Sequence, residues 1–99
     1  METTRQAKIA RLIQKEISEI LRLQTAKTHG IIISVSAVRI SPDLSIAKVY
    51  LSIFPSAKSQ EILENLKKSS KTIRYELGQK VRLQLRKIPE LAFYLDDSL

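Results

Sequence analysis

Two runs of β-branched residues, separated by a short turn, restrict most strongly what this chain can fold into. Residues 31–40 read IIISVSAVRI, and residues 45–54 alternate apolar with more polar side chains. Such composition and alternation are typical of half-buried strands. The sequence SPDL at residues 41–44 favours a turn, because proline presets φ and aspartate bonds to nearby backbone. We therefore predict an antiparallel pair of strands. The core face of the second strand would be formed by Ala47, Val49, Leu51 and Ile53.

Residues 3–23 have the apolar spacing of an amphipathic helix. The side chains that fall on its apolar side are Ile9, Leu12, Ile13, Ile17, Ile20 and Leu21. The side chains that gather on the opposite side are Lys8, Arg11, Lys15 and Arg22. We expect the apolar side to cover one face of the sheet.

A second helical stretch follows Pro55, and it contains an interruption. Its apolar stripe consists of Ile62, Leu63, Leu66, Ile73, Leu77 and Val81. Positions 69 and 70, which would continue this stripe, are both serine, and serine competes for backbone hydrogen bonds. We therefore expect a break or kink near Ser69 and Ser70. Pro89 ends the helical stretch, and alternation over residues 91–95 predicts a short third strand.

These elements combine into one α+β domain over residues 1–99, in the order α-β-β-α-α-β. Its helices would cover one face of a three-stranded sheet. No run approaches the roughly 18 apolar residues of a membrane span, and the N-terminus lacks the apolar core of a signal peptide. The chain contains no cysteine, which fits a reducing compartment. We expect a monomer in the cytoplasm without membrane contact.

The positive charge of the chain is concentrated in one segment. The formal net charge is +7 at pH 7. Residues 67–87 contain eight basic residues and a single acidic residue, Glu76, whereas the rest of the chain balances nine with nine. A charge run is often a solvated helix face, but such faces usually mix signs. We interpret this segment as a surface for a polyanion.

Residues suited to catalysis or metal binding are scarce. His29 is the only histidine, and without cysteine there is no zinc-ligand spacing. Asp96 and Asp97 are strand neighbours that point to opposite faces. Neither Gly30 nor Gly78 belongs to a glycine-rich phosphate motif. We expect no enzymatic activity, no metal and no cofactor; a hydrolase that uses His29 as its base is an alternative.

The aromatic residues do not predict an RNA-binding sheet. That mode needs exposed aromatic side chains interleaved with basic ones on the central strands. Phe93 shares its face with Leu91 and Leu95, which indicates the core. We therefore expect nucleic acid to meet the kinked helical pair, where backbone N–H groups lie beside lysine and arginine.

Three blocks of the sequence resemble the ribosome-binding factor A family, whose members assist assembly of the small ribosomal subunit. They are residues 5–21, with KIA and IQKEISEIL; residues 38–52, VRISPDLSIAKVYLS; and residues 73–99, with IRYELG, VRLQLRKIPELAF and DDSL. The resemblance covers nearly the whole chain. It implies a bacterial (type II) K-homology domain, which agrees with the predicted order of elements.

The resemblance also implies a function. It implies a protein that binds the immature 30S subunit and its 16S rRNA, assists late maturation and 5′-end processing, and supports growth in the cold. The family has an Ala-x-Gly kink between its second and third helices. The matching residues here are Ser69, Ser70 and Lys71. Lysine in place of glycine predicts a different backbone or a less acute kink, and it adds a positive charge.

The candidate rRNA contacts fall into four sets. The first set consists of Lys67, Lys68, Lys71 and Arg74, which lie around the break, together with Arg82. Further along are Lys80, Arg86 and Lys87. On the first helix are Arg5, Lys8, Arg11 and Lys15. Ser69 and Ser70 would contribute backbone N–H groups. Ribosomal proteins and a maturation GTPase are further expected partners. The alternative is a protein-interaction module whose basic face binds an acidic protein and whose RNA contact is incidental.

Overall fold

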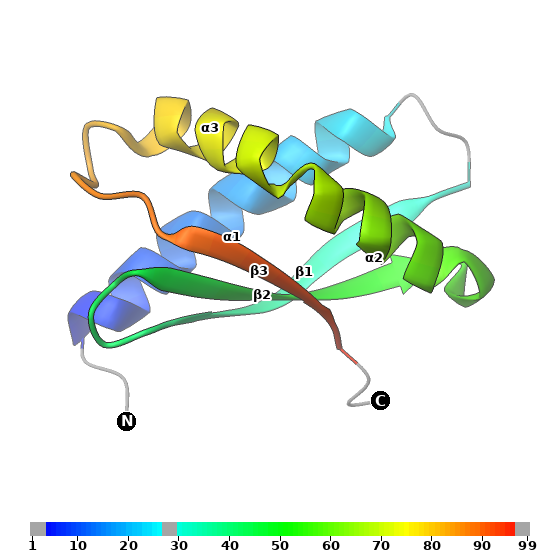
Figure 1. The fold of residues 1–99 in the computed structure, drawn as a ribbon, viewed down its shortest axis with the longest axis horizontal. Helices are drawn as coiled ribbons and strands as arrows, with labels where there is room; N and C mark the ends of the chain where they lie inside the picture. Colours follow the sequence, from blue (N-terminus) through cyan, green and yellow to red (C-terminus); the bar gives the residue numbers. More distant parts are fainter. Residues whose placement is uncertain (1–3, 27–29, 97–99) are drawn as a thin grey trace.

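The structure, a computed structural model, describes residues 4–26 and 30–96 and has three helices on one face of a three-stranded sheet (Figure 1). Its elements are α1 (Thr4–Thr25), β1 (Ile32–Ile40), β2 (Ile46–Phe54), the 3₁₀ turn η1 (Ser56–Lys58), α2 (Ser59–Lys68), α3 (Ser70–Val81) and β3 (Glu90–Leu95). The predicted order α-β-β-α-α-β is confirmed. None of the described helices has the length and apolar character needed to cross a membrane.

The sheet is mixed, with the strand order β1-β2-β3. β1 and β2 are antiparallel, as predicted, and their register pairs Ile40 with Ala47. β3 runs parallel to β2, because α2 and α3 form a crossover that carries the chain back to the end where β2 begins. There the amide of Glu90 donates a hydrogen bond of 2.8 Å to the carbonyl of Ser45.

The core lies between the sheet and the helices. The predicted core face of β2 is confirmed, since Ala47, Val49 and Leu51 are fully buried and Ile53 nearly so. The side chains of the helices that are fully buried against this face are Ile13, Ile17, Leu21, Ile73, Leu77 and Val81. The apolar side chains that recur at helical spacing in the helices and at every second residue in β2 thus form one buried layer.

β1 departs from simple alternation. Val35 and Val38 are both buried although they are three residues apart. The register shifts between Val35, which pairs with Leu51, and Ala37, which pairs with Tyr50. The extra residue, Ser36, forms a bulge that restores the inward direction of the later side chains.

The predicted break between the second and third helices is confirmed. Ser69 separates α2 from α3 with φ −94° and ψ 7°, outside the range of a continuous α-helix. α2 packs on β3 and β2, whereas α3 packs on α1 and β3. Because of the break, the apolar residues of α2 can pack on the sheet while those of α3 pack on α1 and β3.

The prediction that the helical stretch continues to Pro89 is wrong. α3 ends at Val81, where the amides of Gln84 and Leu85 both donate to the Val81 carbonyl, at 2.8 and 2.9 Å. Leu85 is half-buried against the core, whereas Leu83 is 92% exposed. The chain has to turn here because β3 begins beside Ser45. Three candidate cations consequently lie in a loop and not on a helix: Arg82, Arg86 and Lys87.

The turn between β1 and β2 is built by its own polar side chains. The Asp43 carboxylate accepts hydrogen bonds from the Ser41 hydroxyl at 2.8 Å, the Ser45 hydroxyl at 2.7 Å and the Ser45 amide at 3.2 Å. The Ser45 hydroxyl bond contributes most to lowering the pKa of Asp43, to about 2. The amide of Ile46 donates to the Ser41 hydroxyl at 3.0 Å, and Leu44 has a left-handed φ of 63°. The predicted turn at residues 41–44 is confirmed.

Candidate nucleic-acid interface

The joint between α2 and α3 places cations around a backbone that is already hydrogen-bonded. The Ser69 amide donates to the carbonyls of Asn65 and Leu66, both at 3.1 Å, and the Ser69 carbonyl accepts from the Ile73 amide at 3.0 Å. Ser69 thus closes α2 and opens α3 at once. The Ser69 N–H, which the sequence suggested as a phosphate donor, is therefore already hydrogen-bonded at the end of α2.

The joint bends without a left-handed residue at Lys71. Among the described residues, Leu44 is the non-glycine residue with positive φ. The change of direction therefore comes from Ser69 and not from a glycine-like conformation at Lys71, so lysine is tolerated there. Lys68 and Lys71 are both exposed beside the joint.

A shallow hollow of about 250 Å³ lies between the joint and the outer strand of the sheet. Lys67 and Ser70 line it on the helical side, and residues 91–94 of β3 line it on the other. The Lys67 ammonium also lies 3.8 Å from a Glu64 carboxylate oxygen. The exposed lysine is therefore placed where an anion could meet both the joint and β3.

Arg74 has a structural contact that the sequence did not reveal. Its Nη2 donates to the Ile88 carbonyl at 2.7 Å, and its Nε donates to the carbonyls of Ile88 and Pro89 at 3.2 Å. These bonds tie α3 to the segment that leads into β3. Arg74 is therefore first a positioning residue for this segment, and a change at Arg74 would affect the fold as well as any bound phosphate.

Two larger hollows follow along the surface and share Arg86 and Lys87. One, of about 700 Å³, is lined by Lys71, Arg74, Tyr75, Gly78, Gln79, Arg86, Lys87 and Ile88. The other, of about 840 Å³, is lined by Thr4, Arg5, Lys8, Ile9, Asp43, Leu44, Gln84, Leu85, Arg86, Lys87 and Pro89. It lies where the start of α1, the β1–β2 turn and segment 82–89 come together, at the left end of Figure 1.

We group the cations that line these three hollows as one surface, the cationic track, because the two larger hollows share Arg86 and Lys87 and Lys67 of the smallest precedes Lys71 by four residues. Its members are Lys67, Lys71, Arg74, Arg86, Lys87, Arg5 and Lys8. The sequence predicted two separate basic sets, one on the first helix and one in residues 67–87. The fold joins them because segment 82–89 passes beside the first turns of α1. The acidic side chain among the residues that line these hollows is Asp43.

Lys80 lies away from the cationic track. It lines a different hollow with residues of α1 that include Ile20 and Leu23. The pKa of the Glu19 carboxyl is lowered chiefly by its hydrogen bond from Arg22, and the charge of Lys80 adds to the effect. Lys80 therefore lies beside α1, where its charge acts on Glu19.

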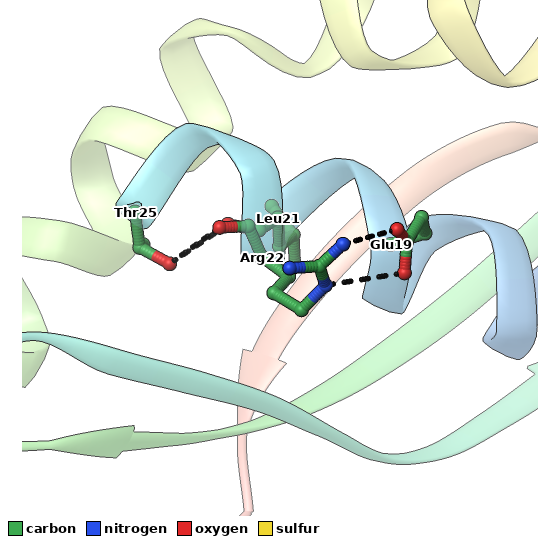
Figure 2. Close-up of polar contacts among 4 residues, drawn as sticks. All are labelled: Glu19, Leu21, Arg22 and Thr25. Atoms are coloured by element: carbon green, nitrogen blue, oxygen red, sulfur yellow. Dashed lines mark hydrogen bonds and ion pairs between the residues drawn. The ribbon is translucent and has the colours of Figure 1, made fainter. Parts of the chain in front are cut away.

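The basic side of α1 divides along its length. Arg22, near the end of the helix, pairs with Glu19 through two nitrogens, and Thr25 bonds to the Leu21 carbonyl (Figure 2). Arg11 and Lys15 are exposed in mid-helix and line none of the three hollows. Arg5 and Lys8 are the members of this side that the fold brings to the cationic track.

Two aromatic side chains lie together on the surface of the sheet. The rings of Tyr50 on β2 and Tyr94 on β3 stack with their centroids 5.5 Å apart and their planes at 26°. Both belong to the sheet face opposite the helices. Exposed Arg39 and Lys48 lie on this face as register partners. The alternation of β2 already placed Tyr50 beside Lys48, but only the parallel pairing of β3 adds Tyr94.

Comparison with known proteins decides the family. The family model described as ribosome-binding factor A matches residues 5–99. The chain belongs to the ribosome-binding factor A family. It is 52% identical over 101 residues to the ribosome-binding factor A of Flavobacterium psychrophilum, a match that covers 100% of this chain and 78% of that protein.

Solved structures agree on the fold. The crystal structure of ribosome-binding factor A from Thermus thermophilus matches with a TM-score of 0.73 at 23% identity, covering 91% of this chain and 94% of that one. A homology model of the Thermus thermophilus factor, fitted into a cryo-EM map of its complex with the 30S subunit, matches with a TM-score of 0.66 at 24% identity. It covers 98% of this chain and 97% of that one. The K-homology architecture implied by the sequence resemblance is consistent with these matches.

Proposed function

We propose that this chain binds the immature 30S ribosomal subunit by laying the cationic track on the phosphate backbone of 16S rRNA. Membership of the ribosome-binding factor A family supports a ribosomal target. The observation that carries the proposal is the track itself, in which cations from α1, the α2–α3 joint, α3 and segment 82–89 line adjoining hollows.

The arrangement favours recognition of rRNA shape over rRNA sequence. Contacts between basic side chains and phosphate fix the position and register of a protein on nucleic acid without reading bases. If about five phosphates are engaged, the logarithm of the affinity should fall against the logarithm of salt concentration with a slope of roughly −3.5 to −4.5.

The proposal extends to the role of the bound protein. It acts without catalysis in late subunit maturation, including processing of the 16S rRNA 5′ end, and supports growth in the cold. Ribosomal proteins and a maturation GTPase are its further partners, and it acts as a monomer in the cytoplasm. The role in maturation follows from the family resemblance, and the compartment follows from the lack of cysteine in the sequence.

Single charge reversals test the cationic track. We expect Lys71→Glu and Lys87→Glu each to weaken cosedimentation with immature 30S subunits by about tenfold or more, since each adds repulsion where a phosphate contact is lost. Lys58→Glu is the matched control, because exposed Lys58 on η1 lies outside the track. Arg74 is left unchanged, since its contacts hold the fold. Equal weakening by all three variants would overturn the site.

Binding to protein-free 16S rRNA distinguishes an rRNA-binding protein from a module that binds an acidic ribosomal protein. If the track binds rRNA, protein-free 16S rRNA should retain the interaction and its sensitivity to Lys71→Glu. An interaction seen only with subunits that retain their proteins would instead support a module that binds an acidic ribosomal protein. Cleavage of the rRNA, lost in His29→Ala, would contradict the non-catalytic role; His29 lies outside the described residues.

A further inference from the structure

We propose that the open face of the sheet is a second RNA site, which binds an unpaired segment by stacking bases on the Tyr50–Tyr94 pair. This site lies on the face opposite the helices and meets the small hollow of the cationic track at β3, because Ala92 and Tyr94 also line that hollow. It adds to the proposed function, but its test needs no ribosomal subunit and therefore stands or falls independently.

The register of the three strands builds the site as two adjacent rows. In one row, Lys48 of β2 pairs with Arg39 of β1 and with Ala92 of β3. In the next, Tyr50 pairs with Ala37 and with Tyr94. The rows are two residues apart along each strand, or about 7 Å. A nucleotide can span this separation with its base on one row and its phosphate on the other.

The ring pair is open to solvent. Tyr94 is 43% exposed, and Tyr50 is half-buried. The register neighbours of the pair are small, because Ala37 flanks Tyr50 and Ala92 precedes Tyr94 along the face by two residues. No large side chain in these rows covers the rings, so a planar base can approach the outer ring.

The row that contains Arg39 and Lys48 places two positive charges side by side. Like charges directly opposite on neighbouring strands destabilise a sheet, yet Arg39 and Lys48 are register partners. Within residues 4–26 and 30–96, neither forms an ion pair with a carboxylate. Glu90 shares this face at the start of β3 but makes no ion pair with Lys48. An anion bound across the row would relieve the repulsion.

These features together favour a single strand over a duplex. A duplex keeps its bases stacked on one another and offers phosphates, sugars and groove edges, none of which needs an aromatic stacking surface. Unpaired bases can stack on aromatic rings with little dependence on sequence, while basic side chains hold the backbone. An acidic polypeptide would satisfy the cations but leaves the stacked rings without a function.

Binding of a fluorescein-labelled RNA strand tests the site. The probe is a mixed-sequence strand of about 12 nucleotides, compared with the same strand annealed to its complement. We expect Tyr94→Ala to weaken single-strand binding by about tenfold, and Tyr94→Phe, which keeps the ring, to change it by less than about twofold. Lys48→Glu should weaken it as well, against Lys58→Glu as the charge-matched control.

Intrinsic fluorescence gives a direct second readout, because the chain has three tyrosines and no tryptophan. In a Tyr75→Phe background only Tyr50 and Tyr94 emit, so quenching on addition of the unlabelled strand reports stacking at this site. Circular dichroism and thermal melting of Tyr94→Ala show whether the variant is folded. If it is not, the quenching of the otherwise intact sheet decides the question.

Three results would overturn the inference: unchanged single-strand affinity in folded Tyr94→Ala, absence of quenching, or equal competition by polyglutamate at the same charge. The outcome for the proposed function is separate. Lys71→Glu should reduce subunit binding whether or not the sheet binds RNA, and Tyr94→Ala should reduce single-strand binding whether or not the track binds subunits.

Discussion

Two connections border the largest hollow of the cationic track, and they are held in opposite ways. The β1–β2 turn bonds to itself, since its Asp43 and Ser41 side chains bind atoms within five residues. Segment 82–89 depends on a distant residue, because Arg74 of α3 holds the Ile88 and Pro89 carbonyls. The turn is therefore specified locally, and the segment that carries Arg86 and Lys87 is specified by tertiary contacts.

This difference has a functional consequence. The two track cations that border both larger hollows, Arg86 and Lys87, lie in the connection that needs outside support. Losing that support would move part of the binding surface while leaving the β1–β2 turn in place. Variants that weaken one connection at a time should separate the two.

The largest effect is expected from Arg74→Ala. It leaves the Ile88 and Pro89 carbonyls without their guanidinium donor and should cost about 1–2 kcal/mol of the free energy of unfolding, a fall of about 4–16 °C in melting temperature. Amide hydrogen exchange should accelerate in residues 82–90 and remain unchanged in residues 41–46.

Arg74→Lys sharpens the same comparison. Lysine keeps the charge but cannot reproduce the planar fork that reaches two carbonyls. We expect it to lose most of the stability that alanine loses. A lysine variant as stable as the parent would show that charge alone, and not the fork, holds the segment.

A smaller effect, dependent on pH, is expected from Asp43→Asn. The pKa of Asp43 is about 2 in the fold, below the ordinary value of 3.8. The carboxylate therefore stabilises the fold above about pH 4, and this contribution is lost as pH falls towards 2. The melting temperature of the variant should lie below that of the parent at pH 7, and the gap should shrink at pH 2. A gap that is constant with pH would contradict this role.

The smallest effect is expected from Leu83→Ser. Leu83 is 92% exposed in segment 82–89, so its replacement should change stability by less than about 0.5 kcal/mol. Thermal melting measures this directly. A clear loss would show that the segment is held by more than Arg74 and Leu85.

Much of the fold could be predicted because its signals are local. Four predicted features each depend on residues that are close together in the sequence: the alternation of β2, the apolar stripe of α1, the SPDL turn and the serine break. All four are confirmed. The bulge at Ser36 was missed, because the sequence of β1 does not show which residue the opposing strand leaves unpaired.

The candidate site was less predictable. The basic residues were visible in the sequence, but their surroundings in the fold were not: Arg74 donates hydrogen bonds to segment 82–89, and the charge of Lys80 acts on the Glu19 carboxyl. The Ser69 amide bonds to the last turn of α2. The Tyr50–Tyr94 stack was missed because it joins strands that are far apart in sequence. The sequence offered one hint of this stack, because Tyr50 alternates with the core residues of β2 and is therefore expected on the open face of the sheet.

By itself, the sequence determined the buried faces of α1 and β2, the break at Ser69 and the concentration of positive charge in residues 67–87, since periodicity, capping and composition act over short distances. Tertiary structure alone decided that Arg5 and Lys8 meet Arg86 and Lys87, that β3 runs parallel to β2, and that two tyrosines stack beside two cations. The physical reason is that these arrangements depend on how layers pack and strands register, which bring together residues that no local pattern connects.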